Sequence, residues 1–127
     1  MSFEFKVYPE ENLIRMRCEG AFTFEELIAH TERVNADPEF RPGMNTLGDY
    51  REASLAGEIS GMSDYVDHTV KLGEVRGSCK WAVIVPDESF TDVIRMYDLV
   101  SRQRGVDIET RAFCEEDEAL AWLKEEE

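Results

Sequence analysis

The chain has 127 residues, of which 43% are hydrophobic, and its formal net charge at pH 7 is −14. This length predicts a single domain over residues 1–127, and the apolar content argues against a disordered chain. Nucleic acids and anionic membranes attract basic surfaces, so the acidity argues against both as partners. No apolar run approaches the roughly 20 residues that a membrane-spanning helix needs, so we expect no membrane insertion.

Two short alternating segments open the chain. Apolar and polar side chains alternate over residues 3–8 and again over residues 13–18, which is typical of strands with one buried face. The turn over residues 9–12 joins them, so the pattern predicts a β-hairpin that ends at Gly20. The polar side chains carry charges of both signs, so we expect that face to remain in water.

A capped helix follows the hairpin. Thr23 stands three residues before Glu26, which is the spacing of a capping box, and apolar residues then recur at helical spacing until about Asn35. A proline soon after Asn35 supports the end of the helix there. His30 falls outside the apolar stripe, which predicts a solvent-facing side chain rather than a metal ligand.

The middle of the chain predicts a weak strand and an amphipathic helix. The strand covers residues 44–50, in which Gly48 indicates the close approach of another backbone. A loop over residues 51–57 then leads to a helix over residues 59–72, whose apolar residues share one side. Ser60 is a candidate cap for that helix.

The most apolar stretch is residues 81–85, Trp-Ala-Val-Ile-Val, and a strand without alternation is one that is covered on both faces. Ser89 and Asp92 have the spacing that caps the next helix. A fifth strand with one wet face over residues 106–112 and an acidic helix over residues 115–124 follow.

The element order is ββαβαβαβα. Strands and helices that alternate at this spacing predict an α/β fold with a mostly parallel, five-stranded sheet, right-handed crossovers and an N-terminal hairpin. In such open sheets, ligands bind beyond the carboxyl ends of the strands. The polar residues expected there are the candidates for a ligand or partner site: Asp49, Arg51, Asp87 and Ser89.

These candidates do not specify a reaction. Asp49 and Asp87 would act as a general acid and base only if they met in a pocket, and the simpler interpretation gives each a local role in capping backbone amides. The sequence has no phosphate-binding glycine loop and no nucleophile elbow. His30 and His68 are both predicted on outward helix faces, so a nucleophile would lack its base. We therefore expect no enzymatic activity, no metal and no other cofactor.

The cysteines and the N-terminal residues indicate the cellular compartment of the protein. Cys18, Cys79 and Cys114 are an odd number without metal-binding or paired spacing, which indicates thiols in a reducing environment. The first residues lack the basic and apolar segments of a signal peptide. Both observations predict a cytoplasmic protein.

Four short stretches stand out for their order along the chain: ADPEFRPG at 36–43, DYR at 49–51, WAVIVPD at 81–87 and ALAWL at 119–123. In this arrangement the chain resembles a bacterial branch of the SpoIIAA-like, or STAS, superfamily over about residues 3–124. The resemblance implies a superhelix of βα units, with strands in sequence order and helices mostly on one face. It also implies a regulatory role.

One departure from that superfamily bears on regulation. Its anti-sigma-factor antagonists carry a phosphorylatable serine in an Asp-Ser-Ser-Gly-like turn at the start of the second helix. Residues 54–61 here read SLAGEISG, so the aspartate–serine pair is absent. We therefore expect neither Ser54 nor Ser60 to be a phosphorylation switch.

Two functions remain open. The resemblance favours a non-enzymatic domain that binds a regulatory protein partner, and the alternative is a domain that binds a small apolar or lipid-like molecule, as in structurally related lipid-transfer folds. Apolar residues beside the main stripes of the second and third helices also predict a homodimer, since a helix packed on a sheet needs only one stripe. The dimer candidates are Tyr65, Leu72, Met96 and Leu99.

Overall fold

The computed structural model describes residues 1–56 and 61–125. Within them, five strands form one sheet in the order β1-β2-β3-β4-β5. The first pair is antiparallel and every other neighbouring pair is parallel, which confirms the predicted α/β fold with its hairpin and mostly parallel sheet. The strands are β1 (Ser2–Tyr8), β2 (Leu13–Phe22), β3 (Asn45–Leu55), β4 (Cys79–Ile84) and β5 (Ile108–Phe113).

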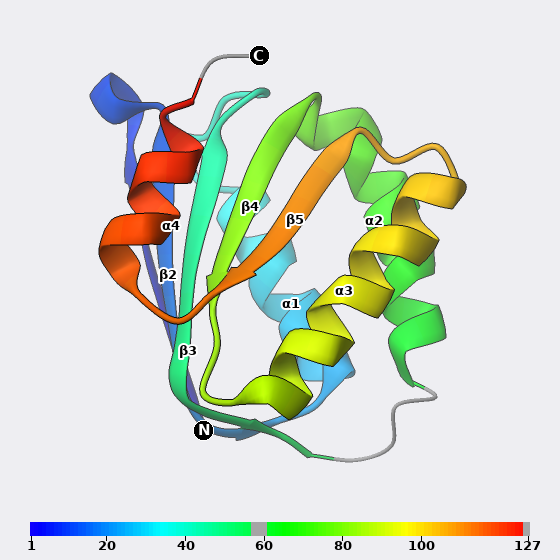
Figure 1. The fold of residues 1–127 in the computed structure, drawn as a ribbon. Helices are drawn as coiled ribbons and strands as arrows, with labels where there is room; N and C mark the ends of the chain where they lie inside the picture. Colours follow the sequence, from blue (N-terminus) through cyan, green and yellow to red (C-terminus); the bar gives the residue numbers. More distant parts are fainter. Residues whose placement is uncertain (57–60, 126–127) are drawn as a thin grey trace.

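Helices cover the two faces of the sheet unequally. Figure 1 shows α1, α2 and α3 in a row on one face, with α4 alone on the opposite face. Since each strand lies beside the next in sequence order, right-handed crossovers bring the connecting helices to one side. The implied layout, with helices mostly on one face, is confirmed. The helices are α1 (Phe24–Asn35), α2 (Met62–Arg76), α3 (Glu88–Gln103) and α4 (Glu116–Leu123).

The predicted cap of α1 is confirmed and that of α3 is wrong. The hydroxyl of Thr23 accepts a hydrogen bond from the Glu26 amide at 3.1 Å, and the Glu26 carboxylate accepts one from the Thr23 amide at 3.0 Å. At α3 the cap is Asp87, whose carboxylate accepts from the Phe90 amide at 2.9 Å. Ser89 lies exposed in the first turn, because an aspartate two residues earlier already satisfies the amide at the helix start.

Strands β2 and β3 are both longer than predicted. Gly20, the expected end of the hairpin, lies inside β2, and β3 runs through residues 51–55 of the expected loop. The two extensions pair with each other, with Gly20 beside Ala53 and Phe22 beside Leu55. Each segment is a weak strand by itself, and the partner strand supplies the backbone hydrogen bonds that keep it extended.

The second helix lies further along the chain than predicted. It covers Met62–Arg76 and therefore continues past the expected end at Leu72. The expected start near residue 59 and the candidate cap Ser60 lie outside the described residues. The extension adds another turn to the buried side of α2, and that turn ends at Arg76.

Strand β4 is covered on both faces, as its sequence predicts. Trp81 belongs to the apolar core under α1, α2 and α3, whereas Ala82 and Ile84 belong to the core under α4. Val83 faces the larger helical layer but is only half-buried. Val83 is incompletely buried in the middle of the sheet because it lines a cavity.

The predicted surface position of His30 is wrong. Its side chain is 0% exposed, and its ring stacks on Phe3 at 4.5 Å between centroids and meets Phe5 edge-on at 5.7 Å. Both phenylalanines come from β1, which covers a flank of α1 that the helical pattern leaves apparently free. Burial, and to a smaller degree the nearby charge of Arg33, lowers the pKa of His30 to about 4.

Candidate functional site

A mainly apolar cavity of about 80 Å³ lies between the sheet and the layer of α1, α2 and α3. Its walls combine side chains from both layers, and most of these are aromatic or aliphatic. The residues that line it are Met16, Phe22, Phe24, Leu27, Thr31, Thr46, Gly48, Tyr50, Leu55, Tyr65, Arg76, Trp81, Ala82, Val83, Phe90, Val93, Ile94, Tyr97 and Thr110.

One end of the cavity lies at the carboxyl ends of the strands. Three aromatic rings meet there: the Phe22 centroid lies 5.6 Å from that of Tyr50, and the Phe90 centroid lies 5.7 Å from that of Tyr50. Phe90 and Leu55 are only half-buried, so the cavity reaches the surface at this edge. This is the edge at which open parallel sheets bind their ligands.

Gly48 shapes the floor of the cavity. A Cβ atom at this position would lie 2.8 Å from Cε1 of Tyr50, which is too close for two carbon atoms. The glycine therefore leaves room for the Tyr50 ring two residues along the same strand. It accommodates a side chain, and not the neighbouring backbone that the sequence predicts. Burial raises the pKa of Tyr50 well above its usual value, so the phenol remains neutral.

The other end of the cavity is polar and contains Arg76. This residue ends α2, and its side chain is 1% exposed. Its guanidinium donates through Nη1 to Oδ1 of Asn35 at 3.2 Å and through Nη2 to the hydroxyl of Thr46. Its Cζ lies 5.2 Å from the ring centroid of Trp81 and 5.3 Å from that of Phe40. Burial lowers the pKa of Arg76.

Two of the expected dimer residues belong to the core. Tyr65 is 6% exposed and Leu72 is 5% exposed, so the prediction that they lie on the surface is wrong. The Tyr65 ring lies 5.7 Å from Phe24 of α1 and 5.3 Å from Tyr97 of α3. Helix α2 has a helix on either side and the sheet beneath it, so it buries more than one stripe. Met96 and Leu99 remain exposed, as expected.

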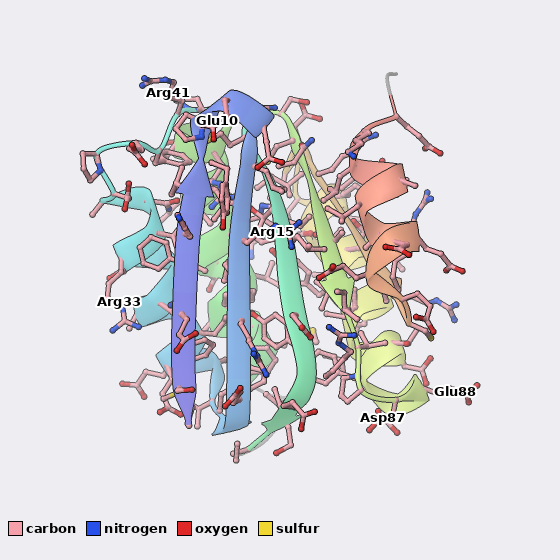
Figure 2. The ribbon with its side chains drawn as sticks, turned by 90° about the vertical axis from the view of Figure 1, so that its left-hand side faces the viewer. Glu10, Arg15, Arg33, Arg41, Asp87 and Glu88 are labelled. Carbon is pink, nitrogen blue, oxygen red and sulfur yellow. The ribbon has the colours of Figure 1, made fainter. Side chains whose placement is uncertain are left out.

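The structure places Asp49 and Arg51 on the other face of the sheet. The Arg51 guanidinium donates to both carboxylate oxygens of Asp49, at 3.0 and 2.8 Å. These hydrogen bonds hold the pKa of Asp49 below its usual value. Both residues line an open groove of mixed charge together with Arg15, which Figure 2 shows on the bare part of the sheet.

Asp87 and Ser89 do not complete that site. Figure 2 shows Asp87 at the far end of the molecule from Arg15, at the turn that begins α3. Neither Asp87 nor Ser89 is among the described residues that line the groove. The four candidates therefore form two local arrangements, an ion pair within β3 and a helix cap, and the two aspartates each have a local partner.

The two buried cysteines are protonated, and the described residues contain no metal-binding cluster. Burial raises the pKa of Cys18 to about 11 and also raises that of Cys79, so both are thiols at neutral pH. No group of three or more His, Cys, Asp and Glu side chains that could hold a metal ion occurs in residues 1–56 and 61–125. Over the same residues, no helix combines the length and apolarity that crossing a membrane requires.

Sequence reasoning missed Arg76, which it assigned to a loop. The signal was present in the spacing: Tyr65, Thr69, Leu72 and Arg76 follow one another at intervals of four, three and four residues. Such spacing places all four on one side of a helix. A glycine follows Leu72, so the sequence predicts the end of the helix there. The predicted helix is therefore one turn too short to include Arg76.

Comparison with known proteins supports the fold. No protein-family model and no curated protein sequence matches the chain. A similar solved structure is an uncharacterised protein of the DUF3478 family with a SpoIIAA-like fold, from Shewanella loihica PV-4. The two chains superpose with a TM-score of 0.60 and 18% sequence identity, over 96% of this chain and 92% of the other. The predicted SpoIIAA-like fold is therefore confirmed.

Proposed function

We propose that this protein is a non-enzymatic binding domain for a small apolar molecule, which occupies the cavity between the sheet and α1, α2 and α3. The cavity itself carries the proposal. Protein cores contain few voids larger than a water molecule, whereas this one has room for several atoms and reaches the surface at the carboxyl ends of the strands. Apolar cavities on the order of 150 Å³ bind benzene, so half that volume suits a short hydrocarbon group.

The size of the cavity limits the expected affinity. Each buried methylene group contributes about 0.8 kcal/mol. Half the volume that holds benzene accommodates about three such groups, which contribute about 2–3 kcal/mol and correspond to a dissociation constant of about 10 mM. A six-carbon alcohol is a suitable neutral probe, because its chain fills the cavity and extends toward the open edge, and its hydroxyl keeps it soluble.

The test is a titration with hexan-1-ol, followed by amide chemical shifts. Shifts are expected in β3, β4 and α3, around Gly48, Val83 and Val93, and not in α4. Val83→Phe fills the cavity from the middle of the sheet and is expected to abolish binding. Val75→Phe adds the same volume at an exposed position of α2 and serves as the matched control. Binding that survives Val83→Phe would contradict the proposal.

A second function, self-association, is supported by the exposed apolar residues of α3. Met96 is 49% exposed and Leu99 is 58% exposed, and side chains three residues apart on a helix are neighbours. We propose a homodimer in which the α3 helices of two copies pair about a two-fold axis. A regulatory protein partner that binds the same two side chains is the alternative.

Light scattering at low and moderate salt tests the dimer. Each copy carries a net charge of −14, so salt is expected to strengthen the association by screening repulsion. Met96→Glu combined with Leu99→Glu is expected to give a monomer, while Tyr65 and Leu72 play no part because they are buried. A monomer at both salt concentrations up to high micromolar protein would rule out the dimer.

A further inference from the structure

We infer that the ligand of this cavity is a monocarboxylic acid, whose carboxylate binds at Arg76 and whose hydrocarbon tail extends toward the carboxyl ends of the strands. The inference rests on the proposed binding function and adds the chemical class of the ligand. Three observations support it: a buried charge without a counter-ion, a set of buried donors without acceptors, and the position of both at one end of the cavity.

The first observation is the missing counter-ion. Arg76 forms no ion pair with any of the described residues, although its side chain is almost completely buried. The groups around it are neutral: the amide of Asn35, the hydroxyl of Thr46, the rings of Phe40 and Trp81, and the thiol of Cys79, whose pKa is raised by burial. Buried charges in proteins are normally paired, because desolvation without a partner is costly.

The second observation is a set of unused donors. Nε of Arg76, Nε1 of Trp81 and the hydroxyl of Thr110 are buried and have no hydrogen-bond partner within the described part of the chain. Arginine and indole nitrogens only donate, and a hydroxyl can donate. An ionised carboxylate only accepts, through two oxygens with about four lone pairs, so it is the complementary group.

The third observation is that these donors belong to one end of the cavity. Thr46, Trp81 and Thr110 are register partners across β3, β4 and β5, and all three line the cavity. The guanidinium of Arg76 lies over the Trp81 ring. Neighbouring strands are about 4.8 Å apart, so the unused donors of Arg76, Trp81 and Thr110 come from adjacent positions.

The charge of the site selects a monoanion. One guanidinium balances one carboxylate, whereas a phosphate monoester with a second negative charge would leave that charge in apolar surroundings. A neutral head group would leave Arg76 without a counter-ion. The tail direction follows from the fold, because Thr46 and Trp81 lie near the starts of their strands and Leu55 and Phe90 lie at the open edge.

The first experiment compares hexanoate with hexan-1-ol on the wild-type chain at pH 7 by calorimetry. Hexanoate is expected to bind roughly 10–100 times more tightly, as a charge-assisted hydrogen bond implies. Longer tails are expected to gain about fourfold per added methylene until the tail reaches the open edge. Equal binding of the acid and the alcohol would overturn the carboxylate inference alone, and binding of neither would overturn the proposed function as well.

The second experiment removes the charge. Arg76→Met is expected to abolish the preference for hexanoate and to retain binding of hexan-1-ol, while Arg95→Met, at an exposed position of α3, retains the preference. A preference that persists in Arg76→Met would overturn the inference. Should that variant fail to fold, Arg76→Lys retains the charge without the planar fork, and the preference is then expected to fall several-fold. An unchanged preference in Arg76→Lys would count against recognition by the guanidinium.

Discussion

Each face of the sheet buries a cation beside a tryptophan, and the two cations differ in their hydrogen-bond acceptors. Under α4, Lys80 is 9% exposed, and its ammonium donates to the backbone carbonyls of Trp122 at 3.1 Å and Glu125 at 2.8 Å. Its Nζ lies 5.2 Å from the Trp122 ring centroid. Under α1, α2 and α3, Arg76 lies over Trp81 and keeps an unused donor.

This difference separates a structural cation from a candidate ligand-binding one. Lys80 attaches the end of the described chain to β4, and backbone carbonyls supply its acceptors. Arg76 also joins elements, through Asn35 and Thr46, but its buried Nε has no acceptor among the described residues. The packing shows the same contrast, since the residues under α4 form a buried apolar cluster and the layer under α1, α2 and α3 contains the cavity.

The largest expected effect compares two neighbouring residues of β4. Ile84 is 0% exposed in the core under α4, whereas Val83 lines the cavity and is half-buried. Ile84→Ala is expected to lower the free energy of unfolding by about 2–5 kcal/mol, and Val83→Ala by about 1 kcal/mol, because the second site already lacks close packing. Urea denaturation measures both, and equal losses would mean that the two faces are packed alike.

The next effect concerns the histidines, which both lie on helices of the cavity face. The folded-state pKa of His30 is about 4, below the ordinary value of 6.5, so the unfolded chain takes up this proton first as the pH falls. Stability is therefore complete above pH 6.5 and decreases toward pH 4, by about 1–3 kcal/mol. His30→Phe is expected to flatten this part of the curve of unfolding free energy against pH.

His68 provides the control for that measurement. Its side chain is partly buried and bonded to Thr31, and burial lowers its pKa as well. His68→Gln is therefore expected to remove a smaller part of the pH dependence than His30→Phe does. Identical curves for the wild type and His30→Phe would show that His30 is accessible to protons in the folded chain.

The smallest expected effect compares the two cations directly. Lys80→Met leaves the carbonyls of Trp122 and Glu125 without their donor and is expected to cost about 1–2 kcal/mol. Arg76→Met removes an uncompensated buried charge, which offsets the loss of the hydrogen bonds to Asn35 and Thr46, and it is expected to change stability by less than about 1 kcal/mol. Thermal unfolding of both variants at pH 7 measures the difference. A larger loss of stability in Arg76→Met than in Lys80→Met would show that Arg76 has the main structural role of the two.

Several elements were predictable because their causes lie within a few residues. The capping box of Thr23 and Glu26 joins groups three positions apart, and the alternation in residues 3–8 and 13–18 reflects a strand's own pleat. The run Trp81–Val85 is apolar at every position, and that alone required a cover on both faces. These local patterns determined the element order and, through the crossover rule, the sheet topology.

The extensions of β2 and β3 were not predictable in this way. Residues 19–22 and 51–55 contain glycine, alanine and charged residues, and neither segment has a strong preference for a strand. They are strands because each lies beside the other in register. The candidate ligand site depends on them, since Phe22 and Leu55 end the extensions and line the open edge of the cavity.

The buried side chains of the helices were also decided by tertiary structure. A helical stripe indicates which side of a helix meets the sheet, but not whether further elements cover its flanks. His30 is buried because β1 brings Phe3 and Phe5 over α1, and Tyr65 because α2 lies between α1 and α3. The sequence by itself determined the elements and their order. Packing between elements distant in sequence decided which polar groups are buried away from solvent. It therefore placed Arg76 at one end of a mainly apolar cavity.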